Sequence, residues 1–304
     1  MAEVTERLRQ RTDLALLPDE PLAAHTSFGI GGPADLMVLP QTAESLAGAL
    51  ADLRQVGLSP HFLGLGTNVL VSDAGVRGVV IKTAGGLLGL SVADSLITAA
   101  AGESLAAVCH LAADAGLSGL EFSAGIPGTV GGALIMNAGA HGGDISSRVE
   151  WVEIATPAGE LQRIAAAEAV FGYRESSFNL PGQAVTRVGL RLAPSTPETV
   201  REQVCELLQR RCAKQPISCR SAGSIFKRPP GDYAGRLIQA VRGNGLQVGD
   251  AAVSDKHANF IVNLGHARAQ DVLELIQTIR ARVHEQFGVD LEPEIRLLGE
   301  PPST

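Results

Sequence analysis

Residues 125–142 read Gly-Ile-Pro-Gly-Thr-Val-Gly-Gly-Ala-Leu-Ile-Met-Asn-Ala-Gly-Ala-His-Gly, the densest run of glycine and small residues in the chain, and they carry almost no charge. Glycine lacks a Cβ, so it lets the main chain approach a ligand closely and adopt positive φ, and successive N–H groups in such turns form an anion-binding nest. A tight crossing of buried backbone explains the same composition equally well. The run therefore predicts a close approach to its backbone and leaves both explanations open.

A second glycine-rich turn lies upstream, at Gly64-Leu-Gly-Thr-Asn-Val-Leu-Val-Ser-Asp73. It follows a short apolar strand expected at 61–65, and small hydroxyl and amide side chains flank its glycines. It is the second candidate for a phosphate cradle. The pair Gly29-x-Gly31 is a weaker signal, because Pro33 follows it and residues 35–39 favour a strand, whereas a Rossmann glycine loop starts a helix.

Composition narrows the function classes. A chain of 304 residues is long enough for two or three domains. Its net charge of -7, with no Lys/Arg cluster among aromatics, argues against a nucleic-acid partner. Residues 1–21 are charged and lack an apolar signal core, and no uncharged apolar stretch of about 18 residues predicts a membrane span. We therefore expect a cytoplasmic protein with no membrane partner.

Metal binding is not indicated by the cysteines and histidines. The four cysteines show no C-x-x-C pair, and the seven histidines show no ligand spacing. Cys109, Cys205 and Cys212 fall in expected helices, where cysteine is usually a small buried hydrophobe. We expect no metal.

The first region, residues 21–193, is expected to be an α+β unit and not a doubly wound sheet. Thr42 caps one helix that Gly57 ends, and Ser104 caps a second helix that runs to Ala115 before Gly116. The strand patterns that accompany them cover 35–39, 78–82, 96–101, 149–155, 161–164 and 184–192, the last three as antiparallel strands. Residues 1–20 form an N-terminal segment, and the region divides into lobes at about 21–83 and 84–193.

A second domain, residues 198–304, is expected after Pro194-Ser-Thr-Pro197, where two prolines interrupt any regular pattern. It begins with a helix at 198–212. Further expected elements are a helix at 234–241, a strand at 259–263, an amphipathic helix at 272–287 that stops at Gly288, and a final strand at 289–298.

Three polar clusters stand out in this apolar background: Tyr173-Arg-Glu-Ser-Ser-Phe178, Ala222-Gly-Ser-Ile-Phe-Lys-Arg-Pro229 and Leu291-Glu-Pro-Glu-Ile-Arg296. Singly, each has an ordinary explanation as a surface pair, a turn or a solvated edge strand. Their order after the two glycine turns favours a functional interpretation.

Together these segments resemble the UDP-N-acetylenolpyruvoylglucosamine reductase family, the MurB-type flavoenzymes of bacterial cell-wall synthesis. The resemblance runs from about Thr26 to Leu298. It rests on Gly31-Gly32-Pro33-Ala34, Gly64 to Asp73, Gly125 to Gly142, Tyr173-Arg174-x-Ser176, Gly223-Ser224-x-Phe226-Lys227 and Glu294-Ile295-Arg296.

The resemblance implies an α+β fold. Residues 21–193 would form a flavin-binding domain of the vanillyl-alcohol oxidase type, and 198–304 a substrate-binding domain, with return of the last strand to the flavin domain as one option. The two glycine turns would surround the pyrophosphate of a non-covalently bound FAD. The implied cofactor-binding residues are Gly64, Gly66, Thr67, Asn68, Val69, Leu70, Gly125, Ile126, Pro127, Gly128, Thr129, Gly131, Gly132, Asn137 and Gly139.

The implied reaction uses NADPH as hydride donor to the flavin, whose N5 delivers hydride to C3 of the enolpyruvyl group of UDP-N-acetylglucosamine enolpyruvate. The product is UDP-N-acetylmuramic acid. Negative charge left at C2 spreads into the carboxylate, so the site needs electrostatic stabilisation and a proton donor. By resemblance Arg174 stabilises that charge, Ser224 donates the proton, and Glu294, protonated or counterbalanced by Arg174, polarises the carboxyl group. Tyr173, Arg228, Tyr233 and His257 are implied substrate contacts, and the implied enzyme is a monomer.

Some positions depart from the family pattern. Arg228-Pro229 stands where many relatives have Asn-Pro, and His141 stands where an aromatic residue is frequent. The chain also lacks a long tyrosine-bearing insertion between Leu192 and Ser218, as in a shorter form of the enzyme. Two alternatives stay open: an oxidase of the same flavin-domain superfamily, and a non-catalytic nucleotide-sugar-binding protein.

Overall fold

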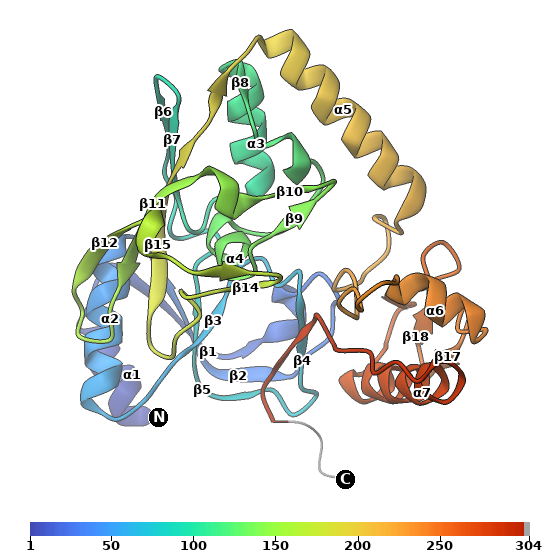
Figure 1. Ribbon diagram of the computed structural model, residues 1–304. Coiled ribbons are helices and arrows are strands. Elements are labelled where there is room, and N and C mark those ends of the chain that lie inside the picture. Colours follow the sequence, from blue (N-terminus) through green and yellow to red (C-terminus); the bar gives the residue numbers. More distant parts are fainter. Residues whose placement is uncertain (301–304) are drawn as a thin grey trace. The chain divides into compact units, whose positions relative to one another are not determined.

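The computed structural model describes residues 1–300 (Figure 1). They divide into two compact units that alternate along the chain. The first unit comprises Met1–Pro18, Leu36–Leu65 and Gly78–Arg211, and the second comprises Asp19–Asp35, Gly66–Arg77 and the residues from Cys212 onward. Each unit has its own cluster of buried apolar side chains.

This division differs from the contiguous domains expected from the sequence. The short segments 19–35 and 66–77 contribute Phe28, Ile30 and Leu70 to the core of the second unit. Burial in that core removes these apolar side chains from water, which favours their place in the second unit. The last four residues of the expected domain 198–304 lie outside the described residues.

The N-terminal part of the chain forms a four-stranded sheet in the order β1-β2-β5-β3, with β3 and β5 parallel. The elements are α1 (Ala2–Arg9), β1 (Leu14–Pro21), β2 (Pro33–Pro40), α2 (Ala43–Gln55), β3 (His61–Leu63) and β5 (Val76–Lys82). The start of α2 is as expected, because Thr42 Oγ1 accepts a hydrogen bond from Ser45 N at 3.0 Å. The end of α2 is also as expected, since Gly57 follows the helix with a φ of 70°.

The first unit also contains a five-stranded antiparallel sheet in the order β12-β11-β15-β7-β6. Its strands are β6 (Leu90–Ala93), β7 (Leu96–Ala100), β11 (Val149–Ala155), β12 (Leu161–Ala165) and β15 (Ala184–Arg191). Helix α3 (Leu105–Asp114), capped by Ser104, is followed by β8 (Leu117–Ser118), which pairs with β16 (Ala193–Pro194). The expected antiparallel α+β unit is confirmed.

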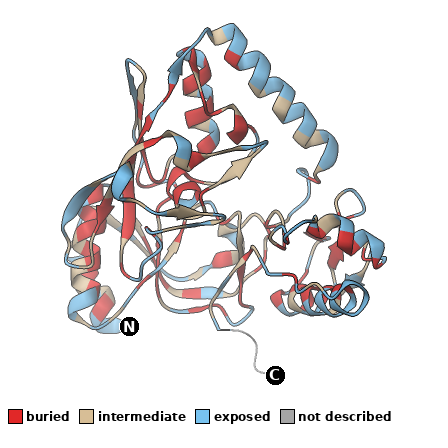
Figure 2. Cartoon of the chain, viewed as in Figure 1, coloured by how far each residue is buried: buried red, intermediate tan, exposed pale blue. Residues whose placement is uncertain are grey.

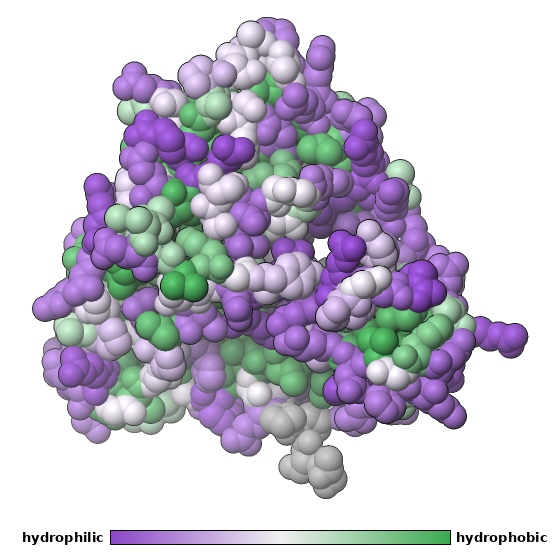
Figure 3. Space-filling view, viewed as in Figure 1, coloured by the Kyte–Doolittle hydropathy of each residue, from purple (hydrophilic) through white to green (hydrophobic). Residues whose placement is uncertain are grey.

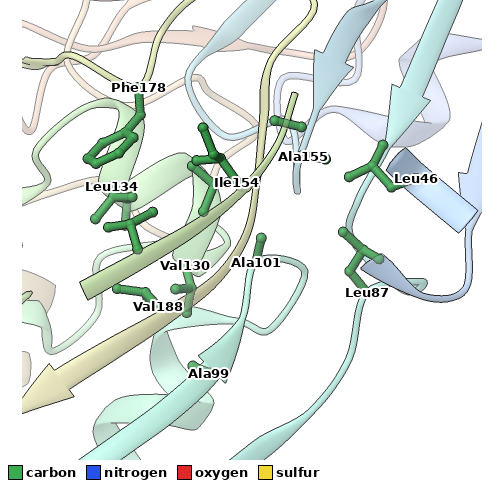
Figure 4. Packing of buried hydrophobic residues seen from close by; sticks show 14 of the residues in the cluster. Leu46, Leu87, Ala99, Ala101, Val130, Leu134, Ile154, Ala155, Phe178 and Val188 are labelled. Carbon is green, nitrogen blue, oxygen red and sulfur yellow. The ribbon is translucent and has the colours of Figure 1, made fainter. Parts of the chain in front are cut away.

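The glycine-rich run contains a short helix, α4 (Val130–Ile135), that the sequence did not predict. Thr129 caps it, with Oγ1 accepting from Gly132 N at 3.2 Å. In Figure 4, Val130 and Leu134 lie among Val188, Ile154 and Phe178, and both α4 side chains are fully buried. Two core side chains and a cap therefore hold a helix that its glycines disfavour.

The first unit also contains several small elements. They are two hairpins, β9 (Gly139–Ala140) with β10 (Gly143–Asp144) and β13 (Phe171–Gly172) with β14 (Glu175–Ser176), and three 3-10 turns, η2 (Glu121–Ser123), η3 (Ile145–Arg148) and η4 (Ala166–Glu168).

Helix α5 (Pro197–Lys214) has an exposed surface along its length (Figure 2), and Val200 is its one buried residue. It confirms the helix expected at 198–212. The expectation of buried cysteines holds for Cys109 of α3 but is wrong for Cys205, which is exposed on α5. This helix has too few apolar residues on one face to bury a stripe.

The second unit combines a three-stranded antiparallel sheet with two helices. Its elements are η1 (Leu22–His25), β4 (Val69–Val71), α6 (Ala234–Ala240), β17 (Gln247–Val248), β18 (Ala251–Val253), β19 (Ile261–Asn263), α7 (Ala269–Phe287) and β20 (Arg296–Leu298). As expected, α7 ends at Gly288, whose φ is 66°. The last strand, β20, pairs in parallel with β4.

The expected strand at 289–298 is wrong over most of its length, because only residues 296–298 are extended in a ladder. Pro293 has no N–H to donate to a ladder. On either side of Pro293 there is one backbone hydrogen bond. Lys227 N donates to Glu292 O at 2.8 Å, and Glu294 N donates to Ile225 O at 2.7 Å.

The visible surface mixes hydrophilic and hydrophobic residues (Figure 3). No helix within residues 1–300 combines the length and the apolar character that a membrane crossing requires.

Candidate active site

The two glycine-rich segments meet in the first unit at Gly64 and Thr129. A Cβ built on Gly64 would lie 2.5 Å from Thr129 Oγ1, closer than any real side chain could stand. Thr129 is 1 % exposed, so it cannot turn away without leaving the core. A side chain at position 64 therefore requires Thr129 or the turn to shift, and the close approach predicted for the backbone of residues 125–142 is confirmed at this contact.

The loop at 125–129 is fastened to the start of α3 by backbone hydrogen bonds. Leu105 N donates to Gly128 O at 3.0 Å, and Val130 N donates to Glu103 O at 2.8 Å. Within residues 1–300, no hydrogen bond uses the N–H groups of Gly128 and Thr129. Two successive backbone N–H groups on a fastened, glycine-rich loop can donate hydrogen bonds to an anion such as a pyrophosphate.

Packed backbone, the second explanation drawn from the sequence, accounts for other glycines of the run. Gly131 N donates to Ala101 O at 2.9 Å, and a Cβ on Gly131 would lie 3.0 Å from the Ala101 Cβ. In the second unit, a Cβ on Gly66 would lie 2.2 Å from His25 O. Close packing excludes a side chain at Gly66, and a side chain at Gly131 requires Ala101 to shift.

Arg174 lies at the tip of the β13–β14 hairpin with a φ of 63°. Three hydrogen bonds tie this hairpin to residues 135–139 of the glycine-rich run. An Nη2 hydrogen of Arg174 is donated to Gly139 O at 3.2 Å, and Ser176 Oγ donates to Ile135 O at 3.2 Å. The third bond comes from Asn137. The structure therefore brings Arg174 together with the second half of the glycine-rich run.

Ser224 belongs to a segment of the second unit that Asn259 holds. Ile225 N donates to Asn259 O at 2.9 Å, and the Asn259 side chain accepts from Phe226 N at 3.0 Å and donates to Phe226 O at 2.8 Å. Asn259 is 7 % exposed, and its amide replaces a strand partner for Phe226. The backbone that carries Ser224 is thereby fixed from one side.

Glu294 lies on the other side of the same segment. Its N–H donates to Ile225 O at 2.7 Å, and its carbonyl accepts from Asn68 Nδ2 at 3.2 Å. Asn68 O in turn accepts from Arg296 N at 3.0 Å. The structure thus brings Ser224 and Glu294 onto adjacent backbone segments, whereas Arg174 belongs to the first unit.

The side chains expected to contact substrate are spread over both units. Tyr173 is 54 % exposed beside Arg174, and Tyr233 is 59 % exposed in the second unit. The Arg228 guanidinium carbon lies 4.1 Å from the centre of the Tyr233 ring, and Arg228 Nε donates to Asp232 O at 3.3 Å. Arg236 and the Tyr233 N–H hold the pKa of the neighbouring Asp232 carboxyl to about 2.

His257 lies next to the segment that holds Ser224. Its Nδ1 accepts a hydrogen bond from Asn259 N at 3.2 Å, and its ring packs edge-on against Phe260 with 4.9 Å between ring centres. Burial lowers the pKa of His257 below its usual value, so the ring is neutral at pH 7. A neutral ring can offer its other nitrogen as a hydrogen-bond donor.

Sequence reasoning missed Asn259 and Ser176 as supports of the candidate site. Asn259 is a polar amide at the start of the apolar run Asn-Phe-Ile-Val-Asn263, and that contrast was the available signal. Ser176 was quoted as part of a motif without a role. Among the described residues, no group of three His, Cys, Asp or Glu side chains could hold a metal ion.

Comparisons with known proteins point to one family. Residues 215–298 match the family model for the C-terminal domain of UDP-N-acetylenolpyruvoylglucosamine reductase, and residues 34–165 match the model for an FAD binding domain. The chain is 46% identical over 287 residues to UDP-N-acetylenolpyruvoylglucosamine reductase of Moorella thermoacetica, covering 94% of each chain. It is 42% identical over 304 residues to UDP-N-acetylenolpyruvoylglucosamine reductase 2 of Symbiobacterium thermophilum, covering 99% of each.

A solved structure gives the same result. The crystal structure of UDP-N-acetylenolpyruvylglucosamine reductase (MurB) from Thermus caldophilus matches with a TM-score of 0.79 and 40% identity, covering 94% of this chain and 98% of that one.

Proposed function

We propose roles for individual residues from the premise that the chain belongs to the UDP-N-acetylenolpyruvoylglucosamine reductase family. The protein is an FAD-dependent oxidoreductase. With NADPH it reduces UDP-N-acetylglucosamine enolpyruvate to UDP-N-acetylmuramic acid, in peptidoglycan precursor synthesis. This membership favours the reductase over the oxidase and the non-catalytic binding protein considered from the sequence. The observation that supports the residue roles best is the placement of Ser224 and Glu294 on adjacent, hydrogen-bonded segments.

The two glycine-rich segments are proposed to hold FAD, with the N–H groups of Gly128 and Thr129 on its pyrophosphate. Bound there, FAD would supply the hydride chemistry that links NADPH to C3 of the enolpyruvyl group. The chain's own contribution here is a loop that hydrogen bonds already hold to the start of α3 and to α4.

Arg174 is proposed to bind the substrate carboxylate and to stabilise the negative charge that develops at C2. A guanidinium stays charged at any physiological pH and can pair with a carboxylate through two parallel hydrogen bonds. Its contact with Gly139 O holds one end of the fork in a defined direction. A preset charge of this kind lowers the barrier because it does not have to reorganise during the reaction.

Ser224 is proposed to deliver a proton from Oγ to C2, which completes the reduction that hydride addition at C3 begins. A serine hydroxyl is a weak acid, so it serves only when a strongly basic carbon is held in contact with it. Glu294 is proposed to polarise the substrate carboxyl group from the adjacent segment, next to Ser224. The two hydrogen bonds between the Asn259 side chain and the Phe226 backbone support the assignment of Ser224, since they fix the segment that carries it.

The expected substrate contacts Tyr173, Arg228, Tyr233 and His257 remain a proposal, as do the domain roles. We propose that the flavin is held mainly by the matched region 34–165 and the UDP-sugar mainly by 215–298. We also propose that the enzyme acts in the cytoplasm, where NADPH and nucleotide sugars are found, as a monomer without nucleic-acid or membrane partners. The net charge of -7 is consistent with this.

Replacement of Ser224 by alanine tests the assignment. Purified protein should show a flavin absorption band that NADPH bleaches and the enolpyruvyl substrate restores. We expect Ser224→Ala to retain bleaching by NADPH, while restoration by substrate slows about 100-fold or more, because only the second half needs the proton. Ser91→Ala, an exposed serine on the edge strand β6, is the control.

Two results would contradict these proposals. If Ser224→Ala slowed reduction of the flavin by NADPH as much as its reoxidation by substrate, Ser224 would be a structural residue. A purified protein that is colourless and does not take up added FAD would contradict the proposed cofactor site itself.

A further inference from the structure

Asn137 lies at the end of α4 with its side chain turned into the protein. It is 7 % exposed, and its φ of 40° falls in the left-handed region that asparagine adopts more readily than most residues. Its backbone N–H donates to Leu134 O at 3.2 Å, which closes the last turn of α4. The position is therefore built around an asparagine rather than merely tolerant of one.

Both ends of the Asn137 amide are used within the first unit. Nδ2 donates to Gly172 O at 3.0 Å, and Oδ1 accepts from Ser146 N at 3.2 Å. Gly172 immediately precedes Tyr173 and Arg174 in the hairpin, and Ser146 lies in η3. One side chain thus joins the end of α4 to the two segments beside it.

Helix α4, which precedes Asn137, is held in the core of the first unit. Val130 and Leu134 of α4 are fully buried in the core of the first unit, and Ala138 O accepts from Ile145 N at 3.0 Å. The hairpin, in contrast, is only two residues long on each side and has an exposed tip. A hairpin of that size is not stable alone and depends on its anchors.

We propose that Asn137 is a positioning residue for Arg174: its amide fixes the Tyr173–Arg174 turn on the end of α4, so that the arginine is held in the direction its role requires. This inference rests on the proposed role of Arg174, and it replaces the cofactor-binding role expected for Asn137 from the sequence. The glycine-rich run then has two functions. Residues 125–129 hold the cofactor, and residues 135–139 hold the hairpin.

Asn137 is the best of the three anchors to test, because its bond involves neither the Arg174 nor the Ser176 side chain. Asn137→Gly keeps the left-handed backbone available and removes both side-chain bonds. Asn137→Asp keeps the acceptor for Ser146 N but replaces the donor to Gly172 O by a second oxygen. Thr186→Val is the control, because it removes a different buried side-chain donor of the first unit, the Thr186 hydroxyl that lies 3.1 Å from Glu153 O and 2.9 Å from Glu153 Oε1.

Two measurements on the full-length, FAD-loaded protein decide the proposal. In hydrogen–deuterium exchange, both Asn137 variants should exchange faster at residues 171–177, with residues 149–155 unchanged. In rapid mixing, both should keep wild-type flavin content and slow the substrate-dependent restoration of flavin absorbance by about 10–100-fold, the cost of a misplaced catalytic group. Thr186→Val should do neither.

Several outcomes would overturn the inference. Unchanged exchange at 171–177 would show that Asn137 does not anchor the hairpin. Loss of flavin with a normal rate per bound flavin would return Asn137 to the cofactor site, and equal slowing in Thr186→Val would reduce the effect to general destabilisation. If wild-type protein carried flavin but did not turn over the enolpyruvyl substrate, the proposed function would fail, while the exchange measurement would still decide whether Asn137 holds the hairpin.

Discussion

Three buried asparagines supply side-chain hydrogen bonds to main-chain groups of neighbouring segments. Asn137, Asn259 and Asn263 are each 7 % exposed, and each uses its side chain on main-chain groups. Leaving a buried backbone group unpaired costs about 1–3 kcal/mol, so these amides specify loop structure that apolar packing alone cannot. Two of them support segments that carry proposed catalytic residues.

The buried ring of His257 predicts a loss of stability in acid. Because burial lowers its pKa in the folded protein, the unfolded chain binds more protons just below the unfolded value of about 6.5. The contribution of His257 is therefore fully present above that pH and is lost as the pH falls through the lowered folded pKa. We expect the free energy of unfolding in urea to fall more between pH 7.5 and 5.5 for wild type than for His257→Asn.

Wild type and His257→Asn share all other histidines, so the difference between their pH dependences of unfolding free energy reports on His257 alone. Identical pH dependence would mean that His257 has the same pKa folded and unfolded, contrary to its burial against Phe260.

At the scale of elements, the contact between the two glycine-rich segments predicts a specific defect. Gly64→Ala places a methyl group 2.5 Å from the Thr129 Oγ1 that caps α4, so either the turn at Gly64 or the cap has to move. We expect the purified variant to keep its circular dichroism spectrum but to lose most of its FAD, measured as flavin absorbance per protein. Gly265→Ala is the control, because its nearest neighbour is Asp250 Oδ2 at an ordinary 3.5 Å.

Full flavin content in Gly64→Ala would show that the contact with Thr129 is ordinary backbone packing. The pyrophosphate site would then have to be sought away from this pair.

Elements with a clear period or cap were predictable from sequence. α2, α3, α7 and β11 follow from their apolar spacing, their capping residues and their terminal glycines. Helix α4 was not, because glycine is a poor helix former and the contribution of Val130 and Leu134 depends on strands distant in sequence. The strand expected at 289–298 was overestimated, because Pro293 forms only an isolated bridge with Phe226 and the regular strand begins at Arg296.

The candidate site shows the same limit. The motifs predicted which side chains carry the chemistry, but they did not reveal that Asn68 supports Glu294 or that Asn259 supports the Ser224 segment. These are hydrogen bonds from side chains to backbone across 226 and 33 residues, and no local pattern encodes them.

At the scale of the whole molecule, the α+β class was predicted and the interleaving of the two units was not. Segments 19–35 and 66–77 are short, and neither has a period that indicates a partner. Their membership of the second unit follows from three-dimensional packing alone, in which Phe28 and Ile30 join side chains from α6 and α7. Sequence order therefore suggested contiguous domains where the packing is discontinuous.

A conservative core substitution tests this interleaving. Ile30 is 2 % exposed in the core of the second unit, and Ile97 is fully buried in that of the first. Replacing either by valine removes one methyl group and should lower stability by about 0.5–1.5 kcal/mol. Because Ile30 packs with the C-terminal elements, Ile30→Val should speed hydrogen exchange at residues 251–263 and 269–287, whereas Ile97→Val should speed it at 96–100 and 184–191. If Ile30→Val instead affected only the strands of the first unit, segment 19–35 would belong with them, as the contiguous division supposes.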